Sequence, residues 1–365
     1  MFIRVQRTGR LGLLIAVLSA ASLVCVASAP AVVVRPLIGL PEDEVYSQAV
    51  LGAIEGAVET IAVLLSSVST TDNPILPALA DAAERGIEVR ALLDASDWAP
   101  DITTRNQPAL SYFLDHGIEA KFDDPEVTLH SKLVIVDRET VILGSSNWNR
   151  YALTEHRQSD VLIGGDSIGA FYANYFDALW DGSLSDAELE LELPDDFGGA
   201  PTVLPLADFP ESASYARVLL ELLSQAERSI HVAMYRISYY SGYADSLAND
   251  LLHALIAASQ RGLDVRVMLD DCAYYEDSAE ANLISAIFLH QRGVDVRLDD
   301  ANLTTHTKLV VIDGDTVLLG STNWNYYSLE RNCETDIVFV DLPEIATPFE
   351  AYFQSLWSSG REVAF

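Results

Sequence analysis

The chain of 365 residues is half hydrophobic and carries 54 Asp plus Glu against 22 Lys plus Arg, a formal net charge of −32. Such a chain can bury a substantial core and is not intrinsically disordered over its bulk. The negative charge argues against a protein that follows nucleic-acid backbones through a broad basic surface, because its summed field repels polyanions.

Residues 1–29 have the pattern of a secretory signal peptide. Three arginines, the last of them Arg10, precede an apolar run that ends in the small residues 27–29. We therefore expect an exported protein that loses this segment by cleavage. The alternative is an uncleaved membrane anchor, because residues 11–34 carry no charge and are numerous enough to span a bilayer.

Alternating strands and helices are predicted from residue 42 to residue 182, the first of two structural repeats. Gly86 and Gly117 each follow a helical pattern, and glycine is the residue that most often ends a helix. Short β-branched runs separate these helices. We predict strands at 60–65, 88–93 and 118–122, helices at 75–85 and 107–115, and a hairpin at 130–143.

Residues 183–212 are acidic and contain glycine and proline, which predicts a connector, with a short edge strand at 188–193. The second repeat, residues 213–365, follows with the same order of elements. We predict a strand at 229–235, a helix at 244–261 and a further strand at 265–269.

An internal duplication underlies this order. The segment 130–148 returns as 306–324 with 12 of 19 positions identical, at an offset of 176 residues. Two other pairs share the offset without a gap: 86–94 with 262–270, and 117–124 with 293–300. Self-similarity at this distance indicates two copies of one α/β unit.

Each copy of the repeated hairpin carries the same polar residues at the same spacing. Side chains two apart in a strand share a face, so a histidine and a lysine stand side by side in both copies. An ammonium neutralises phosphate oxygens while an imidazole attacks or donates a proton. The residues are His130, Lys132, Asp137, Ser145 and Asn147, repeated as His306, Lys308, Asp313, Ser321 and Asn323.

The pattern H-x-K-x4-D-x6-G-S-x-N, present twice, resembles the HKD motif of the phospholipase D superfamily, and the resemblance covers about residues 45–360. It implies an α/β fold of two similar lobes, packed about a pseudo-twofold axis with one shared active-site cleft. It also implies phosphodiester cleavage through a covalent phosphohistidine, with no metal or other cofactor.

The resemblance also implies residue roles. His130 and His306 are the nucleophile and the general acid, and family analogy favours His130 as the nucleophile. The motif aspartates are expected to orient the histidine of the opposite copy, Asp137 serving His306 and Asp313 serving His130. The expected phosphate-binding residues are Lys132, Lys308, Asn147 and Asn323, supported by Ser145 and Ser321.

Family members often continue with N-x-E, whose glutamate supports a catalytic histidine. The second copy keeps this as residues 332–334, ending in Glu334, which we therefore place in the site. The first copy has His-Arg-Gln at 156–158, with Glu155 as a nearby substitute. The two copies are therefore inequivalent, as a division between nucleophile and acid requires.

Other residues carry two interpretations each. Trp148 and Trp324 line the pocket or pack in the core, and Cys272 and Cys333 form a disulfide or remain free thiols. His116, His231, His253 and His290 are expected to be structural. Aromatic side chains in loops after strand ends either contact the substrate or cover a lobe interface, namely Trp98, Tyr239, Tyr240, Tyr243, Tyr274 and Tyr275.

We predict a phospholipase D-like phosphodiesterase, a monomer that contacts membrane surfaces transiently and hydrolyses phospholipid headgroup diesters. An exported endonuclease that cuts nucleic acid is the first alternative, because one fold serves many substrates. A phosphatidyltransferase resembling cardiolipin synthase and a catalytically inactive binding module are the others.

Overall fold

In the computed structural model, the described residues are 3–4, 25–26, 32–39, 43–96, 100–184, 201–243 and 245–363. Most of the expected signal peptide, residue Trp98 and the expected strand at 188–193 lie outside them. No helix within these ranges has the length and apolar character to cross a bilayer. Because most of residues 1–29 lie outside the described ranges, export of the protein stays a prediction.

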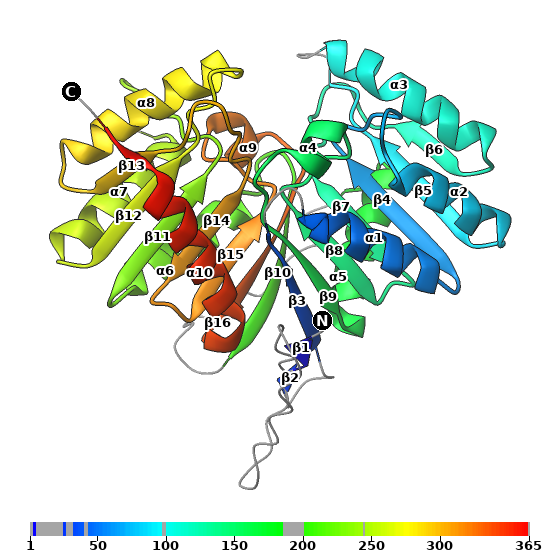
Figure 1. The fold of residues 1–365 in the computed structure, drawn as a ribbon, viewed down its shortest axis with the longest axis horizontal. Coiled ribbons are helices and arrows are strands. Elements are labelled where there is room, and N and C mark those ends of the chain that lie inside the picture. The colour runs from blue at the N-terminus through cyan, green and yellow to red at the C-terminus, as the bar shows by residue number, and fades with distance from the viewer. Residues whose placement is uncertain are drawn as a thin grey trace, which may run out of the picture.

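The chain forms two similar lobes, each a mixed sheet with helices against it (Figure 1). The predicted α/β duplication is confirmed. In the first lobe the strand order is β1-β3-β9-β8-β7-β4-β5-β6, with β2 also on β3. Its elements are β1 (Ile3–Arg4), β2 (Cys25–Val26), β3 (Val32–Leu37), α1 (Val45–Gly56), β4 (Thr60–Leu65), α2 (Ile75–Glu84), β5 (Glu88–Leu93), α3 (Pro100–Asp115), β6 (Glu119–Phe122), β7 (Lys132–Val136), β8 (Thr140–Gly144), α4 (Arg150–Thr154), β9 (Asp160–Gly164) and α5 (Asp166–Asp181).

The second lobe repeats this arrangement with the strand order β10-β16-β15-β14-β11-β12-β13-β17. Its elements are β10 (Thr202–Asp208), α6 (Ser214–Gln225), β11 (Ser229–Met234), α7 (Leu247–Gln260), β12 (Asp264–Leu269), α8 (Glu276–His290), β13 (Asp295–Leu298), β14 (Lys308–Ile312), β15 (Thr316–Gly320), α9 (Tyr326–Glu330), β16 (Glu334–Val340), α10 (Pro343–Ser359) and β17 (Arg361–Glu362).

The domain boundaries differ from those predicted. Residues 202–208 were expected in the connector, but they form β10, which pairs antiparallel with β16 over seven residues. Likewise β3 lies before residue 42 and pairs with β9. Each strand contains a proline, Pro205 or Pro36, which lacks the N–H that a central strand needs and weakens the strand pattern in the sequence. Near the edge of a sheet this loss is tolerated.

The direction of the strands brings both motifs to one edge of each sheet. Strands β4, β5 and β6 run parallel, and β7 runs antiparallel to β4, so Lys132 at the start of β7 pairs with Leu65 at the end of β4. In the second lobe Lys308 pairs with Met234 in the same way. Each motif therefore begins where the parallel strands end, the usual edge for binding in α/β sheets.

The two lobes share one hydrophobic core. Side chains of β7 and β8, such as Leu133, pack in one cluster with side chains of β14 and β15, such as Leu309. Helices α5 and α10 add large aromatic residues to it, including Phe176 and Phe349. Because this cluster joins both sheets, the lobes form one body, and the edges that carry the motifs are held against each other.

Candidate active site

Each motif histidine is held by the backbone of the opposite lobe. The N–H of His130 donates to the carbonyl of Cys333, and the N–H of His306 donates to the carbonyl of Arg157, both at 2.9 Å. Isolated bridges at Leu129–Cys333 and at Arg157–Thr305 continue this pairing. The site is therefore completed only when both lobes are packed together, as the duplication predicts.

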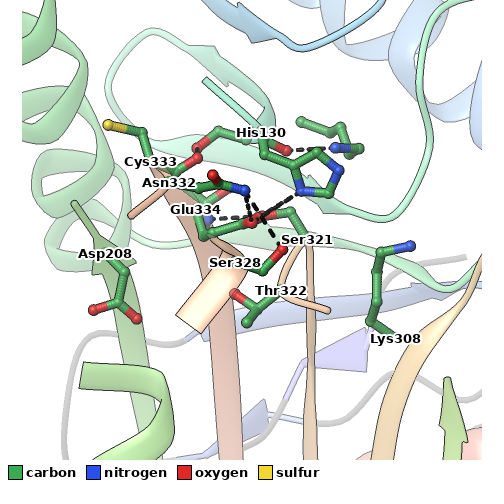
Figure 2. A network of polar contacts seen from close by, with 12 residues as sticks. His130, Asp208, Lys308, Ser321, Thr322, Ser328, Asn332, Cys333 and Glu334 are labelled. Carbon is green, nitrogen blue, oxygen red and sulfur yellow. Dashed lines mark hydrogen bonds and ion pairs between the residues drawn. The ribbon is translucent and has the colours of Figure 1, made fainter. Parts of the chain in front are cut away.

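His130 faces a buried carboxylate from the other lobe. Its Nδ1 lies 2.8 Å from one oxygen of Glu334 and 3.0 Å from the other. The same carboxylate accepts hydrogen bonds from the hydroxyl of Ser321 at 2.5 Å and from the amide of Asn332 at 3.0 Å. Figure 2 shows these side chains converging on Glu334 beneath the His130 ring. Because Nδ1–H donates to Glu334, the lone pair of Nε2 is free to attack.

The surroundings of His130 favour a neutral imidazole that carries its proton on Nδ1, next to an ionised Glu334. Burial would raise the pKa of Glu334, but His130 and Lys132 outweigh it and hold this pKa below its usual value. Burial lowers the pKa of His130, although the Glu334 carboxylate opposes the change. At neutral pH the pair is thus a neutral imidazole beside a carboxylate, which can stabilise positive charge on the ring when Nε2 forms a bond.

His306 has a neutral partner instead. Its Nδ1 donates to the carbonyl of Ser145 at 3.0 Å and contacts Oε1 of Gln158 at 3.2 Å. Burial and the charges of Lys308 and Lys132 hold the pKa of His306 well below its ordinary value. A histidine with a depressed pKa gives up its proton readily once protonated, which suits the general acid.

The expected substitute for the missing glutamate is wrong. Glu155 is exposed and lies 3.7 Å from Arg150. Gln158, at the repeat offset from Glu334, takes the place behind His306 and accepts a hydrogen bond from the hydroxyl of Ser145 at 2.7 Å. The first lobe therefore has an amide where the second has a carboxylate.

Both motif lysines are buried beside the histidines. Lys132 and Lys308 are each 1% exposed, and each ammonium donates to the backbone carbonyl of the histidine two residues earlier. Burial lowers the pKa of Lys132 to about 8 and that of Lys308 well below its ordinary value. Two desolvated cations gain strongly from an anion, so the pair favours a bound phosphodiester.

Asn147 and Asn323 meet the requirements of a phosphate-binding residue. The Oδ1 atom of each is buried and has no hydrogen-bond partner among the described residues. Buried polar atoms are normally paired. An amide turned about its χ2 bond presents its NH2 group at the same point, where it can donate to a phosphate oxygen.

Ser145 and Ser321 do not have the phosphate-supporting role expected of them. Their hydroxyls donate hydrogen bonds to Gln158 and Glu334, so the two serines position the side chains behind the histidines. The residues that follow them, Ser146 and Thr322, bind a second pair of buried carboxylates, those of Asp160 and Asp336, at 2.6 and 2.5 Å. These two aspartates are not among the site residues expected from the sequence, although they too are related by the 176-residue offset.

The expected roles of Asp137 and Asp313 are wrong. The carboxylate of Asp137 accepts three backbone N–H groups at residues 58–60, at 2.7 to 2.9 Å, and Asp313 does the same at residues 227–229. The physical reason is distance. Both histidines lie at the edge where β7 begins, whereas Asp137 follows the far end of β7, about 17 Å away for five residues at 3.3 Å each. Each aspartate anchors a hairpin turn and does not contact a histidine.

With this geometry established, comparison with known proteins identifies the family. The profile described as "Cardiolipin synthase, PLD-like domain" matches residues 50–180 and 219–357, more than half of the chain. Each matched stretch contains one histidine–lysine motif. The chain belongs to the phospholipase D superfamily.

Relatives within the superfamily include both synthases and hydrolases. The chain is 24% identical over 301 residues to a probable cardiolipin synthase of Bacillus subtilis, covering 77% of this chain and 57% of the relative. It is 31% identical over 145 residues to a mitochondrial cardiolipin hydrolase of Xenopus tropicalis, covering 40% and 61%. The chain spans only 37% to 65% of the length of the first curated relatives that it matches.

A solved structure shows the same two-lobed fold. The phosphatidylserine synthase of Haemophilus influenzae superposes with a TM-score of 0.70 at 15% identity, covering 90% of this chain and 87% of that one. At this identity the likeness establishes the fold alone. Among the described residues, no group of three or more His, Cys, Asp or Glu side chains is placed to hold a metal ion.

The motif tryptophans, the two cysteines and His231 have structural positions. Trp148 and Trp324 are fully buried, and their indole N–H groups donate to the hydroxyls of Tyr46 and Tyr215, so they belong to the core and do not line the pocket. Cys272 and Cys333 are free thiols, which excludes the disulfide. His231 is buried in β11 and bonded to Glu350, as a structural histidine should be.

Aromatic rings line the His306 side of this superfamily site. Tyr235, which is not among the site residues expected from the sequence, has its ring 4.6 Å from the His306 ring and 4.8 Å from the ammonium of Lys308. Tyr275 follows at 6.0 Å from Tyr235. Of the expected loop aromatics, Tyr275 reaches the site, whereas Tyr239 stacks on Phe288 at 3.7 Å within its own lobe.

Proposed function

We propose that this protein is a phosphodiesterase that hydrolyses phospholipid headgroup diesters through a covalent phosphohistidine on His130. One observation carries the proposal: the two motif histidines have different partners, a carboxylate behind His130 and an amide behind His306. A carboxylate stabilises the cation formed when an imidazole attacks phosphorus, and a neutral partner leaves the other imidazole free to pass a proton.

The first step forms the intermediate. Lys132, Lys308, Asn147 and Asn323 bind the non-bridging phosphate oxygens. Nε2 of His130 attacks phosphorus, and the bond to the headgroup oxygen breaks on the opposite side. His306, protonated at Nε2, donates its proton to that oxygen, and the headgroup leaves as an alcohol. The approach of an anionic phosphate favours the charged form of His306 that this step needs.

The second step releases the product. Water enters where the headgroup was and gives a proton to the now neutral Nε2 of His306. Its oxygen forms a bond to phosphorus while the bond to Nε2 of His130 breaks. This leaves a phosphatidic acid, restores His130 and recharges His306 for the next turnover.

Lipid is favoured over nucleic acid by charge and by similarity. The chain has a formal charge of −32, which repels a polyanion that lies across its surface, whereas a single diester needs only the buried lysines. The relatives named above carry lipid names, and the family profile is described by a lipid enzyme.

Transfer to an alcohol is the second candidate. It is favoured by the match to a probable cardiolipin synthase, which covers 77% of this chain. Both reactions pass through the same phosphohistidine and differ only in whether water or an alcohol attacks it. The candidates therefore share every step of the first half-reaction.

The test compares the wild type with His130→Asn and with His116→Asn, a control at an exposed histidine after α3. Each is incubated with phosphatidylcholine, phosphatidylglycerol and single-stranded DNA, with and without glycerol. We expect headgroup release by the wild type and the control, none by His130→Asn, and labelled phosphate on the peptide that contains His130. DNA cleavage without lipid turnover would refute the lipid assignment, and label on His306 would refute the assigned nucleophile.

A further inference from the structure

His156 lies beside the site at a second position where the two lobes differ in chemistry. Through the 176-residue offset it corresponds to Asn332, whose amide donates to Glu334 at 3.0 Å. His156 has no such bond with Gln158. Its ring lies 6.2 Å from the ring of His306 and 6.3 Å from the ring of Tyr275. His156 therefore does not support Gln158 in the way that Asn332 supports Glu334, and its ring lies near His306, the general acid.

The His156 ring is available for hydrogen bonds. Its backbone N–H donates to Tyr151, but within the described part of the chain no group forms a hydrogen bond with either ring nitrogen. Burial, reinforced by Lys308, lowers the pKa of His156 to about 4, so the ring is neutral at physiological pH. A neutral imidazole offers one donor and one acceptor, which matches a hydroxyl or a water molecule.

A cavity of about 40 Å³ lies against the same ring. Polar side chains contribute to its lining, among them Tyr46, Ser146, Gln158 and His156 itself. A site that is polar and exceeds about 15 Å³ can hold ordered water, so this cavity has room for two or three molecules. His156 thus borders a water-sized space and lies near the ring of His306.

We propose that His156 binds and positions the water that hydrolyses the phosphohistidine. The inference rests on the proposed function, in which the headgroup leaves opposite Nε2 of His130 and therefore on the His306 side. The attacking water must arrive from that side as well. There a ring nitrogen of His156 accepts a hydrogen bond from one O–H of the water, and that hydrogen stays on the oxygen. The proton of the other O–H is passed to Nε2 of His306 as the oxygen bonds to phosphorus and the bond to His130 breaks.

An alcohol depends on this imidazole less than water does. A water molecule is held only by hydrogen bonds, whereas an alcohol also has an apolar part that packs on the rings of Tyr235 and Tyr275. Loss of the imidazole should therefore slow hydrolysis more than transfer. The ratio of the two products measures this effect directly, because both arise from the same intermediate.

The experiment uses bis(p-nitrophenyl) phosphate with a fixed concentration of ethanol, so that it does not depend on the lipid headgroup. Released p-nitrophenol reports formation of the intermediate. The ratio of p-nitrophenyl phosphate to its ethyl ester reports attack by water or alcohol. The variants are His156→Leu, which fills similar space without a hydrogen bond, His156→Asn, which keeps a polar group, and the control His116→Leu.

We expect His156→Leu to lower the ratio of hydrolysis to transfer by about tenfold, the effect of losing roughly one hydrogen bond. The first burst of p-nitrophenol should stay within about twofold of the wild type, and His156→Asn should recover part of the ratio. An unchanged ratio, or an equal fall in both products, would overturn the inference and leave a structural role. If the wild type turns over this diester but no lipid, the lipid assignment fails while the role of His156 is still decided.

Discussion

Replacing Glu334 by Gln tests whether the carboxylate behind His130 drives the first step. Glu334 is fully buried, and both of its oxygens lie within 3.0 Å of Nδ1 of His130. Glutamine has the same shape but a single acceptor oxygen, so it can accept from Asn332 or from Ser321, which bond to different oxygens of Glu334, but not from both. What is lost is the negative charge that stabilises the imidazolium-like ring after attack.

The expected rate loss follows from the burial of the hydrogen bond between Glu334 and His130. A hydrogen bond to a charged group contributes about 1.5 to 3 kcal/mol, which corresponds to a rate loss of roughly 10- to 150-fold. If the NH2 group of the glutamine turns to His130, Nδ1 must accept, and the ring carries its proton on Nε2 and cannot attack. The loss then lies at the upper end of this range.

The assay is the burst of p-nitrophenol from bis(p-nitrophenyl) phosphate in a stopped-flow instrument, because the burst reports attack by His130 before the intermediate is released. Gln158→Glu is the matched variant, since it places a carboxylate behind His306 and makes that histidine a weaker acid. An unchanged burst rate for Glu334→Gln, with a faster burst for Gln158→Glu, would reverse the assignment of nucleophile and acid.

Three further predictions concern the lysines, the hairpin turn and the lobe interface. Because the pKa of Lys132 is lowered to about 8, the KM for a diester should rise as pH increases through about 8, where the cation is lost. Asp137→Asn should lower the free energy of unfolding by about 1 to 2 kcal/mol, measured by urea titration, and leave kcat within about twofold. The pKa of Asp137 is depressed in the folded state by three N–H donors that outweigh burial, so this stability is present above about pH 4 and is lost at more acidic pH. Arg157→Ala leaves the buried Asp299 carboxylate without its partner at 2.6 Å and should cost about 3 to 5 kcal/mol, whereas Cys333→Ala at the equivalent position of the other lobe should cost less. Equal melting temperatures for these last two variants would contradict that ion-pair argument.

Local patterns predicted the strands well. The bounds expected for 60–65 and 88–93 are those observed, because each strand has a row of apolar residues that ends at a polar residue, Ser66 or Asp94, and the second strand also follows the helix-stopping Gly86. The helix at 107–115 begins earlier, at Pro100, since its first turns are polar and lack the apolar period. The strand at 202–208 was missed because its stability comes from pairing with β16, a partner more than a hundred residues away.

The catalytic residues also divide into those that local spacing predicts and those that depend on contacts between distant parts of the chain. Spacing alone placed His130 beside Lys132, because two residues of a strand point the same way. Spacing could not show which carboxylate serves which histidine. Family analogy suggested Asp137 as a partner for His306, but that aspartate lies at the far end of β7 and holds a turn.

By itself the sequence determined the duplication, the two histidine–lysine motifs and the family, because these depend on residue types at fixed spacing along the chain. Only the tertiary structure decided that Glu334 stands behind His130, that Gln158 stands behind His306, and that His156 faces the site. These contacts join residues up to 204 positions apart across the lobe interface. Such pairs are set by how two sheets pack around a shared core, which is a property of the whole chain and of no local segment.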